Sequence, residues 1–147
     1  MGKTGKSCLF VIAIIAICSA IVITGCSSGP SMEELKKMRD ISWTGTELTV
    51  IVGTNKTNNC EWVADIEDDK VIDYSINRKF TLADSAVTKG DAAGTSSIGF
   101  EGKSEGTTTI LLTTEKDWDG NEPGYSYTIT VEVAPDGNIV SATGAES

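Results

Sequence analysis

Few residue types in this chain can carry chemistry, because its 147 residues include no histidine and only four cysteines. Histidine is the usual general base near neutral pH and the commonest metal ligand. The sequence also lacks a nucleophile elbow, a glycine-rich phosphate loop and a cysteine pair at metal-ligand spacing. These features argue against an enzyme and against a resident cofactor, so we expect a protein that acts by binding.

The cysteine with the clearest chemistry is Cys26, which follows an aliphatic residue and two small residues at positions 23–25. A basic segment with Lys3 and Lys6 and an apolar run over residues 9–23 precede it, in the order of a secretory signal. That run is short for a membrane-spanning helix, which needs about 20 residues. The pattern resembles the lipobox of bacterial lipoproteins, which implies cleavage after residue 25 and a lipid on the Cys26 thiol. An uncleaved membrane anchor is the alternative.

Export and lipidation would fix several properties of the mature chain, residues 26–147. Loss of Lys3 and Lys6 leaves ten basic against 21 acidic residues, a net charge of −11. That acidity argues against nucleic acid as a partner and against electrostatic binding to anionic lipid. We therefore expect the lipid itself to hold the protein in the cell membrane or the outer membrane. With Cys26 acylated, Cys60 is the only thiol left, so no intramolecular disulfide can form.

The segment after the lipid site reads as a tether over residues 26–41. Residues 27–30 are small and flexible in type, and Ser31 and Glu34 then match a capping box. The box predicts a helix of two turns over residues 32–39, which is marginal in water on its own.

From residue 42 to residue 134 the sequence predicts an all-β domain. Residues 125–133 alternate cleanly between apolar and polar side chains, and residues 60–66 place Trp62, Ala64 and Ile66 on one face. Short β-rich runs with turn residues between them favour an antiparallel β-sandwich. The runs cover residues 47–52, 60–66, 71–80, 97–102, 107–114 and 125–133. The polar residues 135–147 are expected to form a flexible tail.

An acidic cluster at Asp65, Glu67, Asp68 and Asp69 has the oxygen ligands that calcium prefers. It lacks the glycine-punctuated spacing of a calcium-binding hand. A solvated turn is therefore the simpler interpretation, and a calcium- or solute-binding lipoprotein is a weaker alternative function.

Three segments stand out as candidate binding loops, at residues 55–62, 90–95 and 115–119. With the strands between them, they resemble the chagasin family, small inhibitors of papain-like cysteine peptidases, over residues 42 to 134. The first family loop reads Asn-Pro-Thr-Thr-Gly-aromatic-x-Trp, of which Asn55, Thr57 and Trp62 match. The second is a glycine-rich run that matches here at Gly94-Thr95. The third reads Arg-Pro-Trp, for which this chain has Lys116-Asp117-Trp118 after a Gly-Thr-Thr-Thr strand.

The resemblance implies an immunoglobulin-like β-sandwich that inserts three clustered loops into a peptidase active-site cleft without offering a cleavable bond. It implies that Thr57 hydrogen-bonds at the loop tip and that Trp118 is the large anchor. We expect a monomer that needs no metal or cofactor. The implied peptidase-binding residues are Asn55, Lys56, Thr57, Asn58, Asn59, Gly94, Thr95, Lys116, Asp117 and Trp118.

Structural roles compete with binding roles at several of these positions. Trp62 lies on an alternating strand and is expected in the core, and Trp43 is expected in the core or plugging an edge. Trp118 stands among charged residues, which favours exposure. Cys60 replaces an aromatic residue, and it reads either as a small apolar filler or as an accessible thiol at the base of the first loop. If the loops do not inhibit, the alternative is a surface adhesion or scaffold module with the same fold.

Overall fold

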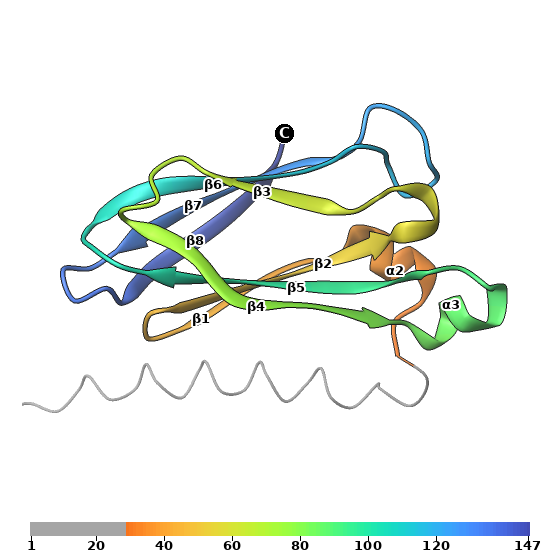
Figure 1. Ribbon diagram of the computed structural model, residues 1–147, viewed down its shortest axis with the longest axis horizontal. Helices are drawn as coiled ribbons and strands as arrows, with labels where there is room; N and C mark the ends of the chain where they lie inside the picture. The colour runs from red at the N-terminus through yellow and green to blue at the C-terminus, as the bar shows by residue number, and fades with distance from the viewer. Residues whose placement is uncertain (1–28) are drawn as a thin grey trace, which may run out of the picture.

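The computed structural model describes residues 29–147, apart from the side chains of residues 76, 77, 88 and 89. Two four-stranded antiparallel sheets face each other, in the strand orders β1-β2-β5-β4 and β3-β6-β7-β8 (Figure 1). The elements are α2 (Met32–Lys37), β1 (Arg39–Thr44), β2 (Glu47–Asn55), a 3-10 turn η2 (Lys56–Asn58), β3 (Trp62–Ile66), β4 (Ile72–Leu82), α3 (Asp84–Lys89), β5 (Ala93–Gly102), β6 (Gly106–Thr114), β7 (Ser126–Val133) and β8 (Ile139–Glu146).

Alternating strands bury one face of each sheet against the other. On β7 every second residue is buried, and Trp62 on β3 is fully buried, as the alternation predicts. Both sheets contribute to one large core cluster, which includes Val50, Phe100 and Ile129. The predicted all-β antiparallel sandwich is therefore confirmed.

The predicted flexible tail over residues 135–147 is wrong, because residues 139–146 form strand β8. This strand pairs with β7 along most of its length, and Ile139 is buried in the core. Its small polar residues conceal it in the sequence, because backbone hydrogen bonds rather than apolar side chains hold most of it. Gly144 is required here, since a Cβ at this position would lie 1.9 Å from the Tyr127 hydroxyl oxygen.

The domain also begins earlier than residue 42, because β1 starts at Arg39 and pairs with β2. Trp43 on this edge strand is 41% exposed, so it is not a core residue. Helix α2 has the predicted capping box, in which Ser31 and Glu34 each accept a hydrogen bond from the other's backbone N–H. Its Leu35 is fully buried, so docking supplies the stability that two isolated turns lack.

Within residues 29–147, no helix is long and apolar enough to cross a membrane. Among the described residues, the members of both core clusters lie within residues 32–142. The proposed signal segment and Cys26 lie outside the described residues.

Candidate functional site

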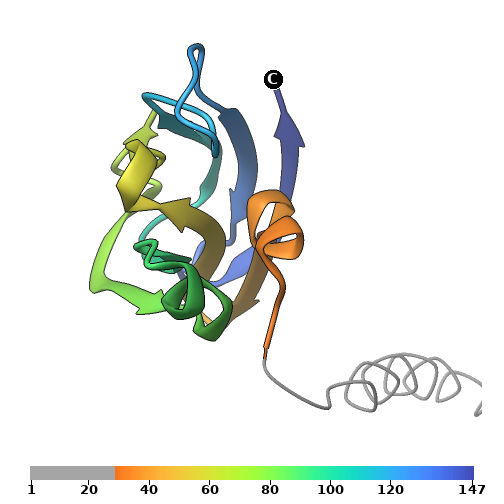
Figure 2. The same ribbon diagram turned by 90° about the vertical axis from the view of Figure 1, so that its right-hand side faces the viewer.

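Three connections far apart in the sequence meet at one end of the sandwich, which we call the loop end. They are the first loop (residues 56–61, between β2 and β3), the second loop (residues 90–92, after α3) and the third loop (residues 115–125, between β6 and β7). Figure 2 looks onto this end, with α2 and α3 beside the loops. Strands β2, β4 and β6 all run toward this end, and β3, β5 and β7 run back from it, which places the three connections together (Figure 1).

Hydrogen bonds tie the first loop to the second. The Lys56 N–H donates to the Ala92 carbonyl oxygen at 2.8 Å, and the Ala92 N–H donates to the Thr57 hydroxyl oxygen at 2.8 Å. The resemblance implies a hydrogen bond from Thr57 to a peptidase, whereas in this structure its hydroxyl accepts one from the second loop. This pairing fixes the separation of the two loops.

The first loop is also tied to the third. The side-chain amides of Asn55 and Asn58 both donate to the Trp118 carbonyl oxygen, at 3.1 and 2.8 Å. Asn55 is buried and Asn58 is half-buried, so these two predicted site residues hold the third loop in place. Two donors on one carbonyl restrict the peptide unit that carries Trp118.

The tip of the first loop turns on Asn59, which has a φ of 58° in the left-handed region. Asparagine tolerates this conformation better than most residues with a side chain. The turn closes on a bridge between Asn55 and Cys60, whose backbone groups exchange hydrogen bonds of 3.0 and 2.9 Å. Lys56, Thr57 and Asn59 are exposed at this tip.

Asp117 shapes the third loop rather than presenting a free charge. One carboxylate oxygen accepts hydrogen bonds from the backbone N–H groups of Asn121 and Asp119, each at 2.9 Å. The bond from Asn121 is the main reason that the pKa of Asp117 lies below its usual value. The stability that these bonds give the third loop is therefore fully present above the pKa of this carboxyl in the unfolded chain. It is lost as the pH falls through the lower pKa of Asp117 in the folded protein. Lys116, also predicted to bind, is only half-buried, and its carbonyl accepts from the Thr114 hydroxyl.

The predicted exposure of Trp118 is wrong, because its side chain is 6% exposed. It belongs to a second core cluster under the loop end, with Leu35, Cys60, Ala86 and Ala93. Helix α2 supplies Leu35 to this cluster and closes over it with an ion pair between Lys36 and Asp119, whose atoms Nζ and Oδ2 are 3.1 Å apart. The sequence around Trp118 gives no sign of this, since the covering residues come from elsewhere in the chain.

Gly94 and Thr95 do not lie in the second loop, because β5 begins at Ala93. Gly94 is buried and pairs with Thr54 on β2 and Leu82 on β4. Its lack of a side chain serves packing, since a Cβ would lie 1.9 Å from the Thr81 carbonyl oxygen.

We expect Gly94→Ala to destabilise the domain by about 1–3 kcal/mol, because β4 and β5 must separate to admit the methyl group. Chemical unfolding of residues 27–147 measures this change. Thr95→Ala, one residue further along the same strand and half-buried, is the control and should change stability by less than about 1 kcal/mol. Equal effects of the two substitutions would contradict the packing role of Gly94.

Cys60 is fully buried in the cluster beneath the loops, which fits a small apolar filler and not an accessible thiol. Burial is the main cause that raises the pKa of this thiol above its ordinary value. Both effects suppress reactivity, because the thiolate is the nucleophile and it must also be reached.

In residues 27–147, where Cys60 is the only thiol, we expect a maleimide to label the folded protein only as fast as the domain opens. Mass spectrometry at timed intervals measures this rate, and addition of denaturant should bring labelling to completion within the mixing time. Rapid labelling of the native protein at neutral pH would contradict the burial of Cys60.

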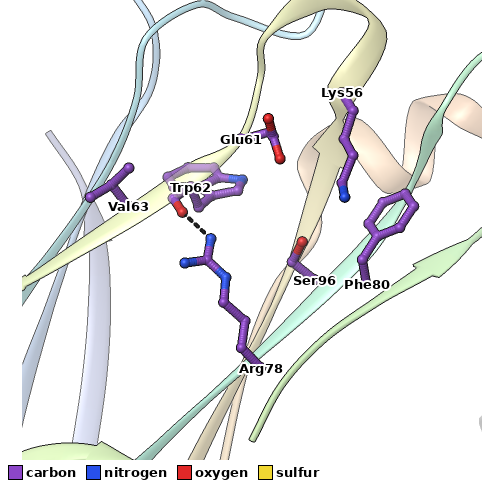
Figure 3. Close-up of a pocket in the computed structure, with 7 residues that line it drawn as sticks. All are labelled: Lys56, Glu61, Trp62, Val63, Arg78, Phe80 and Ser96. Carbon is purple, nitrogen blue, oxygen red and sulfur yellow. Dashed lines mark hydrogen bonds between the residues drawn. The ribbon is translucent and has the colours of Figure 1, made fainter. Parts of the chain in front are cut away.

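A cleft of about 470 Å³ lies beside the first loop, between the edge strands β3 and β4 (Figure 3). The Lys56 ammonium lies 4.4 Å from the Phe80 ring centroid, so this predicted site residue points into the cleft. Arg78 crosses the cleft and donates to the Trp62 carbonyl oxygen, which joins the two sheets. The lining residues are Lys56, Glu61, Trp62, Val63, Arg78, Phe80 and Ser96.

Sequence reasoning missed the residues that brace the loop end from its sides. Arg39 places its guanidinium 4.5 Å from the Trp62 ring centroid and 5.0 Å from that of Tyr125. Neither Arg39 nor Arg78 carries a local signal in the sequence, because each contacts residues far away in the chain.

Among residues 29–147, no group of three or more cysteine, aspartate or glutamate side chains is placed to hold a metal ion. In the predicted acidic turn, Glu67 accepts a hydrogen bond from Thr109 and Asp68 accepts one from the Lys70 N–H. The calcium site is therefore not formed by these side chains.

No protein-family model, curated protein or solved structure matches this chain. The structural observation at the loop end is the set of hydrogen bonds that hold its three loops in one arrangement.

Proposed function

We propose that this chain is a membrane-anchored inhibitor of papain-like cysteine peptidases that blocks the active-site cleft with the loop end. In this proposal the sandwich is immunoglobulin-like in the manner of the chagasin family. The chain is exported, cleaved after residue 25 and carried on lipid at Cys26, in the cell membrane or the outer membrane, as a monomer.

The observation that carries the proposal is the convergence of three separate loops into one hydrogen-bonded unit. The first loop is bonded to both of the others, because Lys56 and Thr57 bind the second loop and Asn58 binds the third. Such cross-links keep the loops in one shape before binding, so association would cost little ordering entropy. A rigid loop held on both sides is also a poor substrate, since a peptidase needs an extended segment to cleave.

Burial of Trp118 changes how the loops would engage a peptidase. Trp118 is a buried residue that supports the first and third loops from beneath. In this proposal the exposed tip residues Lys56, Thr57 and Asn59 contact the peptidase instead. Without a protruding aromatic anchor, the interface lacks the usual centre of binding energy. We therefore expect inhibition in the micromolar range, about −8 kcal/mol, rather than at nanomolar concentration.

A surface adhesion or scaffold module without inhibitory activity is the second candidate, and the same burial of Trp118 favours it. In that case the loop-end contacts would serve only to stabilise the fold. The two candidates differ in one observable, which is competition with substrate at a peptidase active site.

Progress curves of papain with a fluorogenic peptide, in the presence of residues 27–147, test the proposal. We expect competitive inhibition, and we expect the domain to remain intact by mass spectrometry after prolonged incubation. Papain alkylated at its active-site cysteine serves as the binding control. Cleavage within residues 56–61, or no inhibition at about 10 µM, would exclude the inhibitor and leave the adhesion module.

A further inference from the structure

The chain enters the domain at the loop end, beside α3. Gly29 and Pro30 line a hollow of about 280 Å³ together with Leu82 of β4 and Asp84 of α3. The Pro30 carbonyl oxygen accepts a hydrogen bond of 3.2 Å from the Ser85 hydroxyl. The point at which the tether meets the fold is therefore fixed on α3.

Only three peptide units separate Cys26 from Gly29. A fully extended chain covers at most about 3.6 Å per residue, so Gly29 lies within about 11 Å of the residue proposed to carry the lipid. If Cys26 sits at a bilayer surface, the part of the domain around α3 is held close to that surface.

Two large apolar side chains are exposed at this place. Leu82 is 46% exposed at the end of β4, and Val87 is 60% exposed on α3. Single exposed apolar residues are ordinary on a protein surface. Leu82 lines the same hollow as Gly29 and Pro30, and Val87 lies on α3, the helix whose Ser85 binds the Pro30 carbonyl oxygen. A lipid phase around Cys26 would be within reach of both elements.

We propose that the α3 surface, meaning Leu82 and Val87 beside the tether entry, rests on the lipid bilayer and orients the anchored domain. This proposal rests on the lipid anchor at Cys26 and is independent of peptidase inhibition. The partner is the apolar boundary of a zwitterionic bilayer, because the domain's net negative charge and the nearby Asp84 oppose anionic headgroups. The third loop projects from the opposite side of the loop end to α3, so it faces away from the lipid (Figures 1 and 2).

The orientation can be measured with tryptophan fluorescence on vesicles. Residues 26–147 are coupled through the Cys26 thiol to a maleimide-bearing lipid in phosphatidylcholine vesicles, which needs no cellular lipidation. Val87→Trp places a reporter on the α3 surface, and Leu82→Trp is a second reporter in case the first variant does not fold. Val140→Trp is the matched control, because Val140 is also an exposed valine but lies at the start of β8, at the opposite end.

With brominated phosphatidylcholine, we expect the added emission at position 87 or 82 to fall about twofold or more, and that at position 140 to stay unchanged. The result should not depend on salt concentration. Equal quenching at both ends, or quenching at neither, would overturn the proposal. Because papain is absent from this assay, its outcome is separate from that of the inhibition test.

Discussion

Trp118→Ala should destabilise the domain by about 3–5 kcal/mol, the usual effect of truncating a buried tryptophan. The side chain fills the cluster beneath the loop end, so its removal leaves a cavity between α2 and the first loop. The backbone carbonyl that accepts from the Asn55 and Asn58 amides remains in the variant, but the side chain that seats this part of the third loop is gone. Urea unfolding of residues 27–147 measures the change in the free energy of unfolding.

The matched control for this prediction is Trp43→Ala. Trp43 is 41% exposed on the edge strand β1, and its loss should change the free energy of unfolding by less than about 1 kcal/mol. If Trp118→Ala proved equally mild, Trp118 would be a surface residue and its role as a peptidase anchor would return. A strong effect means that loss of inhibition in this variant cannot be read as loss of a contact.

Arg39→Ala is expected to destabilise the domain by about 3 kcal/mol. The guanidinium lies over Trp62 and Tyr125, whose rings are stacked with centroids 5.9 Å apart. One of its terminal nitrogens also donates to the Lys36 and Met38 carbonyl oxygens, at 3.2 and 2.8 Å. The substitution therefore removes a desolvated cation–π contact and the donor that satisfies the end of α2.

The ion pair of Arg39 with Glu146 should contribute little to that loss. Nε lies 3.1 Å from a Glu146 oxygen without the angle of a good hydrogen bond, and the Glu146 side chain is 58% exposed. Glu146→Gln is thus the control, with an expected change below about 1 kcal/mol in thermal or urea unfolding. Because Arg39→Ala also removes this ion pair, equally large effects of the two substitutions would assign the stabilisation to the ion pair and contradict this account.

Local patterns predicted the parts of the fold that local forces decide. Alternation located β7 and placed Trp62 in the core, and the spacing of Ser31 and Glu34 located the start of α2. In each case the deciding contacts lie within a few residues of the pattern.

Contacts between distant segments decided the rest, and the sequence carries no local trace of them. Trp118 reads as exposed among charges, yet Leu35 covers it from more than eighty positions earlier in the chain. Gly94 reads as a loop glycine, yet β5 extends through it because the Thr81 backbone packs where a side chain would stand. In the sequence, strand β8 resembles a tail, because backbone hydrogen bonds to β7 hold it rather than a pattern of apolar side chains.

The most direct test of the inhibitor proposal blocks one end of the domain at a time. In residues 27–147, Lys56→Cys and Lys103→Cys each add one exposed thiol, at the loop end and at the opposite β5–β6 turn, while Cys60 stays buried. Each variant is coupled to a bulky polyethylene glycol maleimide and titrated against papain. We predict micromolar inhibition by the unsubstituted domain, a loss of about tenfold or more with the polymer at position 56, and little change with it at position 103. Absence of inhibition, or equal loss from both positions, would contradict the proposal that the loop end binds the peptidase.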